Sequence, residues 1–109
     1  MIEQYPERRR WPRYSVVVEC YIEGIATRAA VRLTTLGMGG GYVDAKSPVG
    51  RGDTIVLALI LDGAELKVSA NVVYSQDATG FGFAFDTGDM PAVARQRIEE
   101  FLRRRAAQA

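Results

Sequence analysis

Apolar and polar side chains alternate along much of the chain, which is the pattern of half-buried β-strands. Residues 14–22 place every second side chain on one apolar face, and residues 27–33 pair an apolar face with a face that carries Arg28 and Arg32. Residues 55–61 are almost continuously aliphatic, so we expect this strand to be buried on both faces.

Two further runs in the second half of the chain also predict strands. Residues 66–74 alternate, and Tyr74 falls on the same face as the aliphatic side chains of that run. Phe81, Phe83 and Phe85 share one face of a last strand. The opposite face of that strand carries only glycine and alanine, which would let another backbone approach closely.

Turn residues separate these runs and predict hairpin connections. Glu23-Gly24 and Asp62-Gly63 are two-residue hairpin signals, and the second is the stronger. The glycines of residues 37–41 predict a tight turn into a short strand at Tyr42-Val43. The predicted fold class is therefore mainly β, a closed or nearly closed six-stranded antiparallel barrel.

After Asp89 the spacing of apolar residues changes to that of a helix. Asp89 is a suitable N-cap and Pro91 suits the first turn of a helix that we expect over residues 89–107. Its apolar arc consists of Met90, Ala94, Ile98, Phe101 and Leu102. This arc should pack on the barrel or cover one open end, and the arginines that follow suit the C-terminal end of the helix dipole.

Length and composition limit what such a barrel can be. The 109 residues suffice for one domain with a modest core, and 48% of them are apolar. The single cysteine, Cys20, lies on an apolar strand face, excludes an internal disulfide and fits a reducing compartment. No apolar run is long enough to span a membrane, so we expect a cytoplasmic protein with no membrane partner.

Charge and side-chain chemistry argue against two classes of function. A net charge of +1 does not suit a protein that coats nucleic acid. The sequence has no histidine, no cluster of metal ligands and no nucleophile beside an obvious base, so we expect no metal, no cofactor and no enzyme activity. The glycine-rich segment is not a P-loop, because the Gly-Lys-Ser/Thr ending is missing, although its N–H groups could meet a ligand.

The strongest candidate for binding chemistry is a basic arm, residues 1–13, which precedes a barrel-and-helix body, residues 14–109. The arm gathers the side chains Arg8, Arg9, Arg10, Trp11 and Arg13. A guanidinium grips phosphate with a planar fork of donors or stacks on a flat ring, and an indole adds a stacking face. This chemistry suits a ligand with phosphates and bases, and binding should order the arm. The alternative is a solvated basic tail.

The whole arrangement resembles the PilZ domain, the bacterial receptor module for cyclic di-GMP. The likeness covers nearly the whole chain, from the basic arm through the barrel to the C-terminal helix. Arg9-Arg10-Trp11-Pro12-Arg13 matches the family's Arg-x-x-x-Arg motif, and Gly80-Phe81-Gly82-Phe83-Ala84-Phe85 is similar to its last strand. The resemblance implies that Arg9 and Arg13 bind cyclic di-GMP, with Arg10 and Trp11 supporting the arm. In the family, an arginine at the position of Arg8 accompanies binding of a stacked nucleotide pair.

The family's second binding motif is only partly present. Asp/Asn-x-Ser-x-x-Gly aligns with Thr35-Leu36-Gly37-Met38-Gly39-Gly40, where only the terminal Gly40 agrees. Thr35 replaces the acidic or amide residue that reads a guanine edge, and Gly37 lacks the side chain of the serine. Losing two neutral hydrogen bonds of about 1 kcal/mol each would weaken binding roughly tenfold to a hundredfold. Restoring both side chains by Thr35→Asp and Gly37→Ser should then tighten binding. The alternative for Gly37 is a positive φ that serine tolerates poorly, so Thr35→Asp should also be tested alone.

Three functions therefore stay open. The first is a cyclic di-GMP receptor that passes the second-messenger level to a downstream protein, with ligand contacts from Arg8, Arg9, Arg13, Thr35, Gly37 and Gly40. The second is a PilZ-like adaptor that no longer binds nucleotide and acts through protein contacts. The third is a barrel that binds single-stranded nucleic acid by stacking on the Gly-Phe-Gly-Phe run. Against the third, we expect the phenylalanines to face the core.

Overall fold

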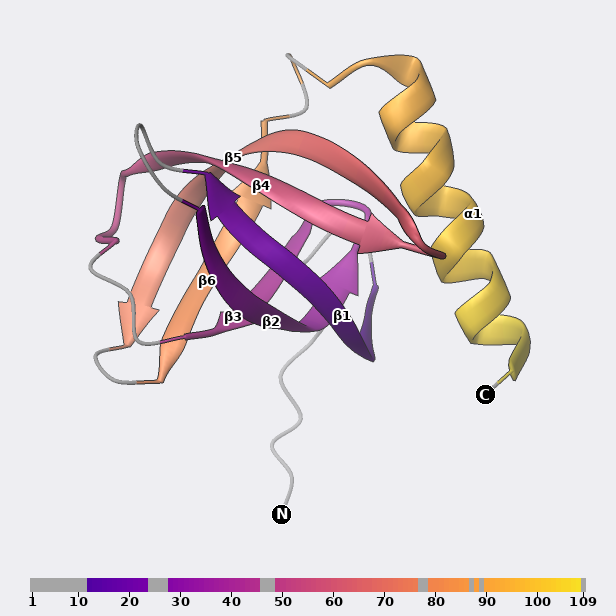
Figure 1. Ribbon diagram of the computed structural model, residues 1–109, viewed down its shortest axis with the longest axis horizontal. Coiled ribbons are helices and arrows are strands. Elements are labelled where there is room, and N and C mark those ends of the chain that lie inside the picture. The colour runs from indigo at the N-terminus through magenta and orange to yellow at the C-terminus, as the bar shows by residue number, and fades with distance from the viewer. Residues whose placement is uncertain are drawn as a thin grey trace.

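The computed structural model describes residues 12–23, 28–45, 49–76, 79–86, 88 and 90–108. These residues form a closed barrel of six antiparallel strands with one C-terminal helix beside it (Figure 1), which confirms the predicted fold class. The order around the barrel is β1-β2-β3-β6-β5-β4, and pairing of β1 with β4 closes it. The elements are β1 (Arg13–Glu23), β2 (Arg28–Gly37), β3 (Gly40–Asp44), β4 (Thr54–Leu61), β5 (Ala64–Gln76), β6 (Gly80–Phe85) and α1 (Ala92–Gln108).

Alternating side chains of the strands fill the interior of the barrel. In β1, Val16, Val18 and Cys20 point inward and are buried, whereas Val17 between them is 74% exposed. The phenylalanines of β6 are buried, as the sequence predicts. Burial raises the pKa of the Cys20 thiol from 9.0 to about 12, because the apolar surroundings disfavour the thiolate. Cys20 is therefore a packed core residue.

The strand β4 departs from the predicted burial on both faces. Leu57 and Leu59 point into the core, but Val56 is 37% exposed. Val56 pairs with Glu23 of β1 and with Ser69 of β5, and paired residues point to the same side of a sheet. These polar neighbours show that the outer face of β4 is solvated at this point. The prediction of burial on both faces is therefore wrong for Val56.

The predicted Asp62-Gly63 turn joins β4 to β5. Its two residues have positive φ angles of 51° and 82°, as a two-residue type I′ hairpin requires. Two arginines of α1 hold this hairpin. Arg104 forms an ion pair with Asp62 of the turn. The Arg97 guanidinium donates to the carbonyl oxygens of Ala64 and Glu65, at 3.0 and 3.2 Å. The helix is therefore fixed to the end of the barrel where this hairpin lies (Figure 1).

Helix α1 packs through the part of the predicted apolar arc that lies on it, whereas Met90 precedes the helix, which begins at Ala92 and not at residue 89. Ile98, Phe101 and Leu102 are 0%, 4% and 4% exposed and join the barrel core, together with Ala94. The carbonyl oxygen of Pro91 accepts a hydrogen bond from the N–H of Arg95, which begins the helical ladder. Asp89, the cap suggested by the sequence, lies outside the described residues.

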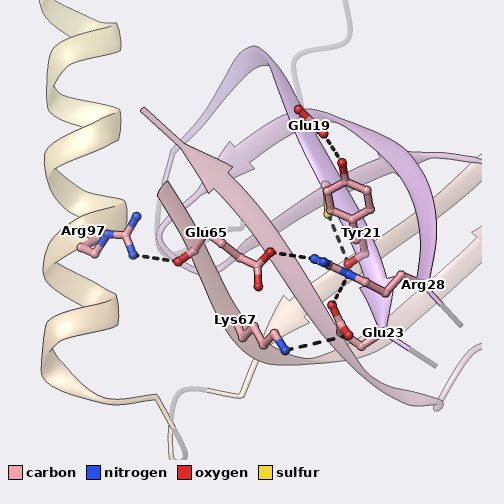
Figure 2. A network of polar contacts seen from close by, with 8 residues as sticks. Glu19, Tyr21, Glu23, Arg28, Glu65, Lys67 and Arg97 are labelled. Carbon is pink, nitrogen blue, oxygen red and sulfur yellow. Dashed lines mark hydrogen bonds and ion pairs between the residues drawn. The ribbon is translucent and has the colours of Figure 1, made fainter. Parts of the chain in front are cut away.

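A network of charged side chains covers the outer face where β1, β2, β4 and β5 meet (Figure 2). Arg28 is its centre, with Nε 2.8 Å from Oε2 of Glu23 and Nη2 2.7 Å from Oε1 of Glu65. The Arg28 guanidinium also lies over the Tyr21 ring, 4.3 Å from its centroid. Glu23 is the last residue of β1 and pairs with Arg28. The predicted turn at Glu23-Gly24 is therefore wrong for Glu23, and residues 24–27 lie outside the described residues.

Candidate functional site

The C-terminal end of the basic arm meets the second motif where β1 begins. Arg13 is the first residue of β1 and pairs with Gly37, the last residue of β2, and Ser15 pairs with Thr35. Leu36, between the two motif residues, points inward and is completely buried. Arg13, Gly37 and Thr35 therefore occupy the outer face of the barrel. Arg8, Arg9, Arg10 and Trp11 lie outside the described residues.

Gly37 packs directly against the chain that carries Arg13. A Cβ atom added at Gly37 would lie 2.4 Å from the carbonyl oxygen of Pro12 and 3.0 Å from Cγ of Arg13. Gly37 is not among the described glycines with positive φ, so close approach rather than backbone conformation explains its lack of a side chain. A serine at position 37 would displace the backbone of the Pro12–Arg13 segment.

Gly40, the one motif residue that agrees with the family pattern, has a structural reason of its own. Its φ is 154°, and a Cβ atom there would lie 2.1 Å from the carbonyl oxygen of Phe83 in β6. The preceding residue, Gly39, accepts a hydrogen bond from the N–H of Phe85 at 2.9 Å. Gly40, the final glycine of the motif, thus lets β3 start close to β6. It thereby fixes how the loop after Gly37 returns to the sheet.

Thr35 belongs to a row of paired residues that runs across five strands. Ser15 of β1 pairs with Thr35, Thr35 pairs with Tyr42 of β3, and Tyr42 pairs with Gly82 of β6. Gly82 in turn pairs with Tyr74 of β5. Because paired residues share a side of the sheet, this row places two tyrosines on the same outer face as the motif position Thr35.

The position of Tyr74 corrects the sequence-based interpretation, which placed this ring on the core face of its strand. The pairing of β5 with β6 shifts register between Val72 and Tyr74, and Tyr74 is 42% exposed. This bulge turns Tyr74 outward. The bulge has no composition signal of its own. The outward orientation of Tyr74 could have been predicted only from a pairing of this tyrosine with the glycines of the last strand.

The predicted close approach of another backbone occurs at Gly80, next to Val43, but at Gly82 the nearest atoms belong to the Tyr74 ring. A Cβ atom at Gly82 would lie 2.3 Å from Cε1 of Tyr74, and one at Gly80 would lie 2.9 Å from Cε2 of Tyr42, as well as 2.0 Å from a backbone carbonyl oxygen. The ring centroids of the two tyrosines are 6.0 Å apart, and their planes are inclined by 31°. The Tyr42 hydroxyl donates to Oε1 of Gln76 at 2.9 Å, which fixes its ring.

This outer face offers chemistry suited to binding. It combines the Arg13 guanidinium, the Thr35 hydroxyl and two aromatic rings. Among the described residues, no group of three or more acidic or sulfur side chains is placed to hold a metal ion. Within the same residues, no helix combines the length and the apolar composition needed to cross a membrane. Cations, a hydroxyl and aromatic faces are suited to a ligand with phosphates and flat bases.

Solved structures with the same fold come from several bacteria. The motility inhibitor MotI/DgrA of Bacillus subtilis has a TM-score of 0.74 at 15% identity, covering 95% of this chain and 54% of its own. YcgR of Escherichia coli in complex with cyclic di-GMP has a TM-score of 0.70 at 24% identity, covering 94% and 49%. The isolated PilZ domain of YcgR with cyclic di-GMP has a TM-score of 0.72 at 21% identity, covering 94% and 96%. The chain thus spans about half the length of MotI and of the longer YcgR chain.

At these identities the structural likeness shows the fold alone, and a comparison with curated protein sequences gives no significant match. The model of the PilZ domain, however, matches residues 7–104, which include the arginines of the arm and most of the helix. This match covers most of the sequence. The chain therefore belongs to the PilZ domain family.

Proposed function

We propose that this protein is a receptor for cyclic di-GMP that transmits the level of the second messenger to a protein partner. The observation that carries the proposal is the pairing of Arg13 with Gly37. This pair brings the end of the Arg-x-x-x-Arg motif beside the second motif on one outer surface. Two segments that are far apart in sequence then face one ligand, as a compact nucleotide with two phosphates and two guanines requires.

Each proposed contact has a distinct chemical role. Arg9 and Arg13 pair with the phosphates or bond to O6 and N7 of guanine, with Arg8 assisting. Thr35 offers one hydroxyl to a guanine edge. Gly37 and Gly40 contribute backbone and the close approach of the loop, and Arg10 and Trp11 support the arm. The two YcgR structures of similar fold support this ligand class, because both hold cyclic di-GMP.

The second candidate function is an adaptor that acts through protein contacts without nucleotide. The contact of Gly37 with Pro12 favours it, because the position where the family pattern has a serine side chain is closed by the chain itself. Thr35 also lacks the second acceptor of a carboxylate. The two functions differ in one measurable property, which is binding of cyclic di-GMP by the purified protein.

The decisive experiment is a calorimetric titration of the wild-type protein and of Arg13→Ala with cyclic di-GMP. We expect wild type to bind and Arg13→Ala to show no detectable heat, with a melting curve close to that of wild type. Arg9→Lys should weaken binding because the planar fork is lost. Arg95→Ala, an exposed arginine of α1, is the matched control and should bind as wild type does.

Two results would contradict the receptor function. Binding by Arg13→Ala at wild-type affinity would mean that the arm is not part of the site. A wild-type protein that gives no heat with cyclic di-GMP would favour the adaptor.

A further inference from the structure

The tyrosines of the Thr35 row are neighbouring aromatic rings on the outer face beside the second motif. Tyr42 is the direct cross-strand partner of Thr35, and Tyr74 follows one strand further along, across Gly82. The centroids of the two rings are 6.0 Å apart. A guanine is a flat bicyclic ring, so two neighbouring phenol rings at this spacing offer a surface comparable in width to a base.

Both tyrosines lie close to the backbone of β6, Tyr42 at Gly80 and Tyr74 at Gly82. The positions that a Cβ atom would take at Gly80 and Gly82 lie within 2.9 Å and 2.3 Å of ring atoms of Tyr42 and Tyr74. Only a glycine backbone permits a ring to lie this close to the strand. Tyr74 nevertheless stays 42% exposed, which is high for a large aromatic side chain. Part of this side chain is therefore accessible to a ligand.

A third tyrosine on the outer surface, Tyr21, has a ring face that is covered by a guanidinium. Tyr21 of β1 carries the Arg28 guanidinium at 4.3 Å from its centroid, and Arg28 is itself paired with Glu23 and Glu65 (Figure 2). Among the described residues, no guanidinium lies over Tyr42 or Tyr74 in this way. Tyr21 therefore already has a cation–π partner within the protein, whereas Tyr42 and Tyr74 have none among the described residues.

We propose that Tyr42 and Tyr74 form a stacking platform for a guanine base of cyclic di-GMP, an inference that rests on the proposed receptor function. The platform would replace binding energy that the motif has lost at Thr35 and Gly37. Aromatic faces bind any base by stacking and need no hydrogen-bonding partner at a particular edge. Stacking would thus let the site keep affinity for the nucleotide although Thr35 stands in place of a carboxylate and Gly37 in place of a serine.

The test is a calorimetric series with cyclic di-GMP at position 74. Tyr74→Leu keeps an apolar cover over Gly82 but loses the aromatic face, and we expect its affinity to fall about fivefold to a hundredfold. Tyr74→Phe keeps the ring and should bind as wild type does. Tyr42→Leu should weaken binding in the same range. Tyr21→Leu is the matched control, because it removes an outer-surface tyrosine that already carries Arg28, and it should leave affinity unchanged.

A proton NMR measurement gives a readout that a structural role of the rings would not produce. The H8 signal of a guanine stacked on a ring should move upfield on binding to wild type and to Tyr74→Phe. In Tyr74→Leu this upfield shift should shrink at saturating ligand. Melting curves of each variant show whether the fold is intact, and the wild-type shift tests stacking without any substitution.

The outcomes separate this inference from the receptor function. If wild type binds, Arg13→Ala does not, and the leucine variants at positions 42 and 74 bind as wild type does, the platform is wrong and the receptor function stands. A bound ligand whose H8 signal does not shift upfield would likewise overturn the platform. If wild type does not bind cyclic di-GMP, both proposals fail.

Discussion

At the scale of single residues, Gly37 limits what the second half of the site can be. The resemblance alone suggests that a missing serine could simply be restored. The close contact of Gly37 with the Pro12 carbonyl oxygen shows that the space for this side chain is taken by the chain that leads to Arg13. The chain departs from the family motif at Thr35 and at Gly37. Thr35 is partly exposed on the outer face, so only this departure can be reversed without moving the backbone.

We therefore expect the two reversions to act in opposite directions. Thr35→Asp should tighten cyclic di-GMP binding by about tenfold to a hundredfold, because a charge-assisted hydrogen bond to a guanine edge is worth about 1.5–3 kcal/mol. Gly37→Ser should lower the melting temperature and weaken binding, because it displaces the segment that carries Arg13. Calorimetry and thermal melts on the two single variants check both statements. A Gly37→Ser variant that binds more tightly than wild type would contradict the steric explanation.

Cys20 should make stability depend on pH in the alkaline range. The thiol ionises near its ordinary pKa of 9.0 in the unfolded chain, whereas burial keeps its pKa at about 12 in the fold. Above pH 9 the unfolded state releases a proton that the folded state retains, so stability is full below this pH and falls as the pH rises toward 12. Urea midpoints at about pH 8 and about pH 10.5 should therefore differ more for wild type than for Cys20→Ala. Equal differences would mean that other groups cause the decline.

At the scale of elements, α1 is joined to the barrel by an apolar arc and by its arginines at the Asp62-Gly63 turn. Phe101 is 4% exposed, so Phe101→Ala should lower the free energy of unfolding by about 3–5 kcal/mol. Val93 lies on the same helix but is 65% exposed. Val93→Ala should therefore change the free energy of unfolding by less than about 0.5 kcal/mol. Urea unfolding followed by circular dichroism measures both. An unchanged curve for Phe101→Ala would show that the helix does not pack through this residue in solution.

The strands also show where sequence periodicity succeeds and where it stops. The alternation in β1 and β6 correctly predicts which side chains enter the core, because burial and the two-residue period coincide there. In β5 the alternation continues in the sequence up to Tyr74, but the bulge after Val72 inserts a residue and reverses the facing. Such a bulge depends on the pairing partner in β6, which local pattern does not specify.

At the scale of the whole molecule, the barrel was predictable as a class but its non-sequential neighbours were not. Hairpin signals relate only consecutive strands, such as β4 and β5 at Asp62-Gly63. The pairings of β3 with β6 and of β1 with β4 come from closure of the sheet. For the same reason, the arginine chemistry of the arm could be derived from sequence, whereas the Thr35–Tyr42–Gly82–Tyr74 row could not. That row exists only when β2, β3, β6 and β5 lie side by side.

Closure of the sheet also decides how a partner protein can recognise this domain. Each strand of the barrel lies between two neighbouring strands, although β1 and β4 pair over only part of their lengths. The barrel thus offers a partner only short unpaired stretches to which it could add a strand of its own. A partner reads mainly side chains instead, on the outer surface or on the helix. Recognition of this kind is sensitive to small changes of surface shape and charge, such as those that the proposed binding of a nucleotide with two phosphates would make on one face of the barrel.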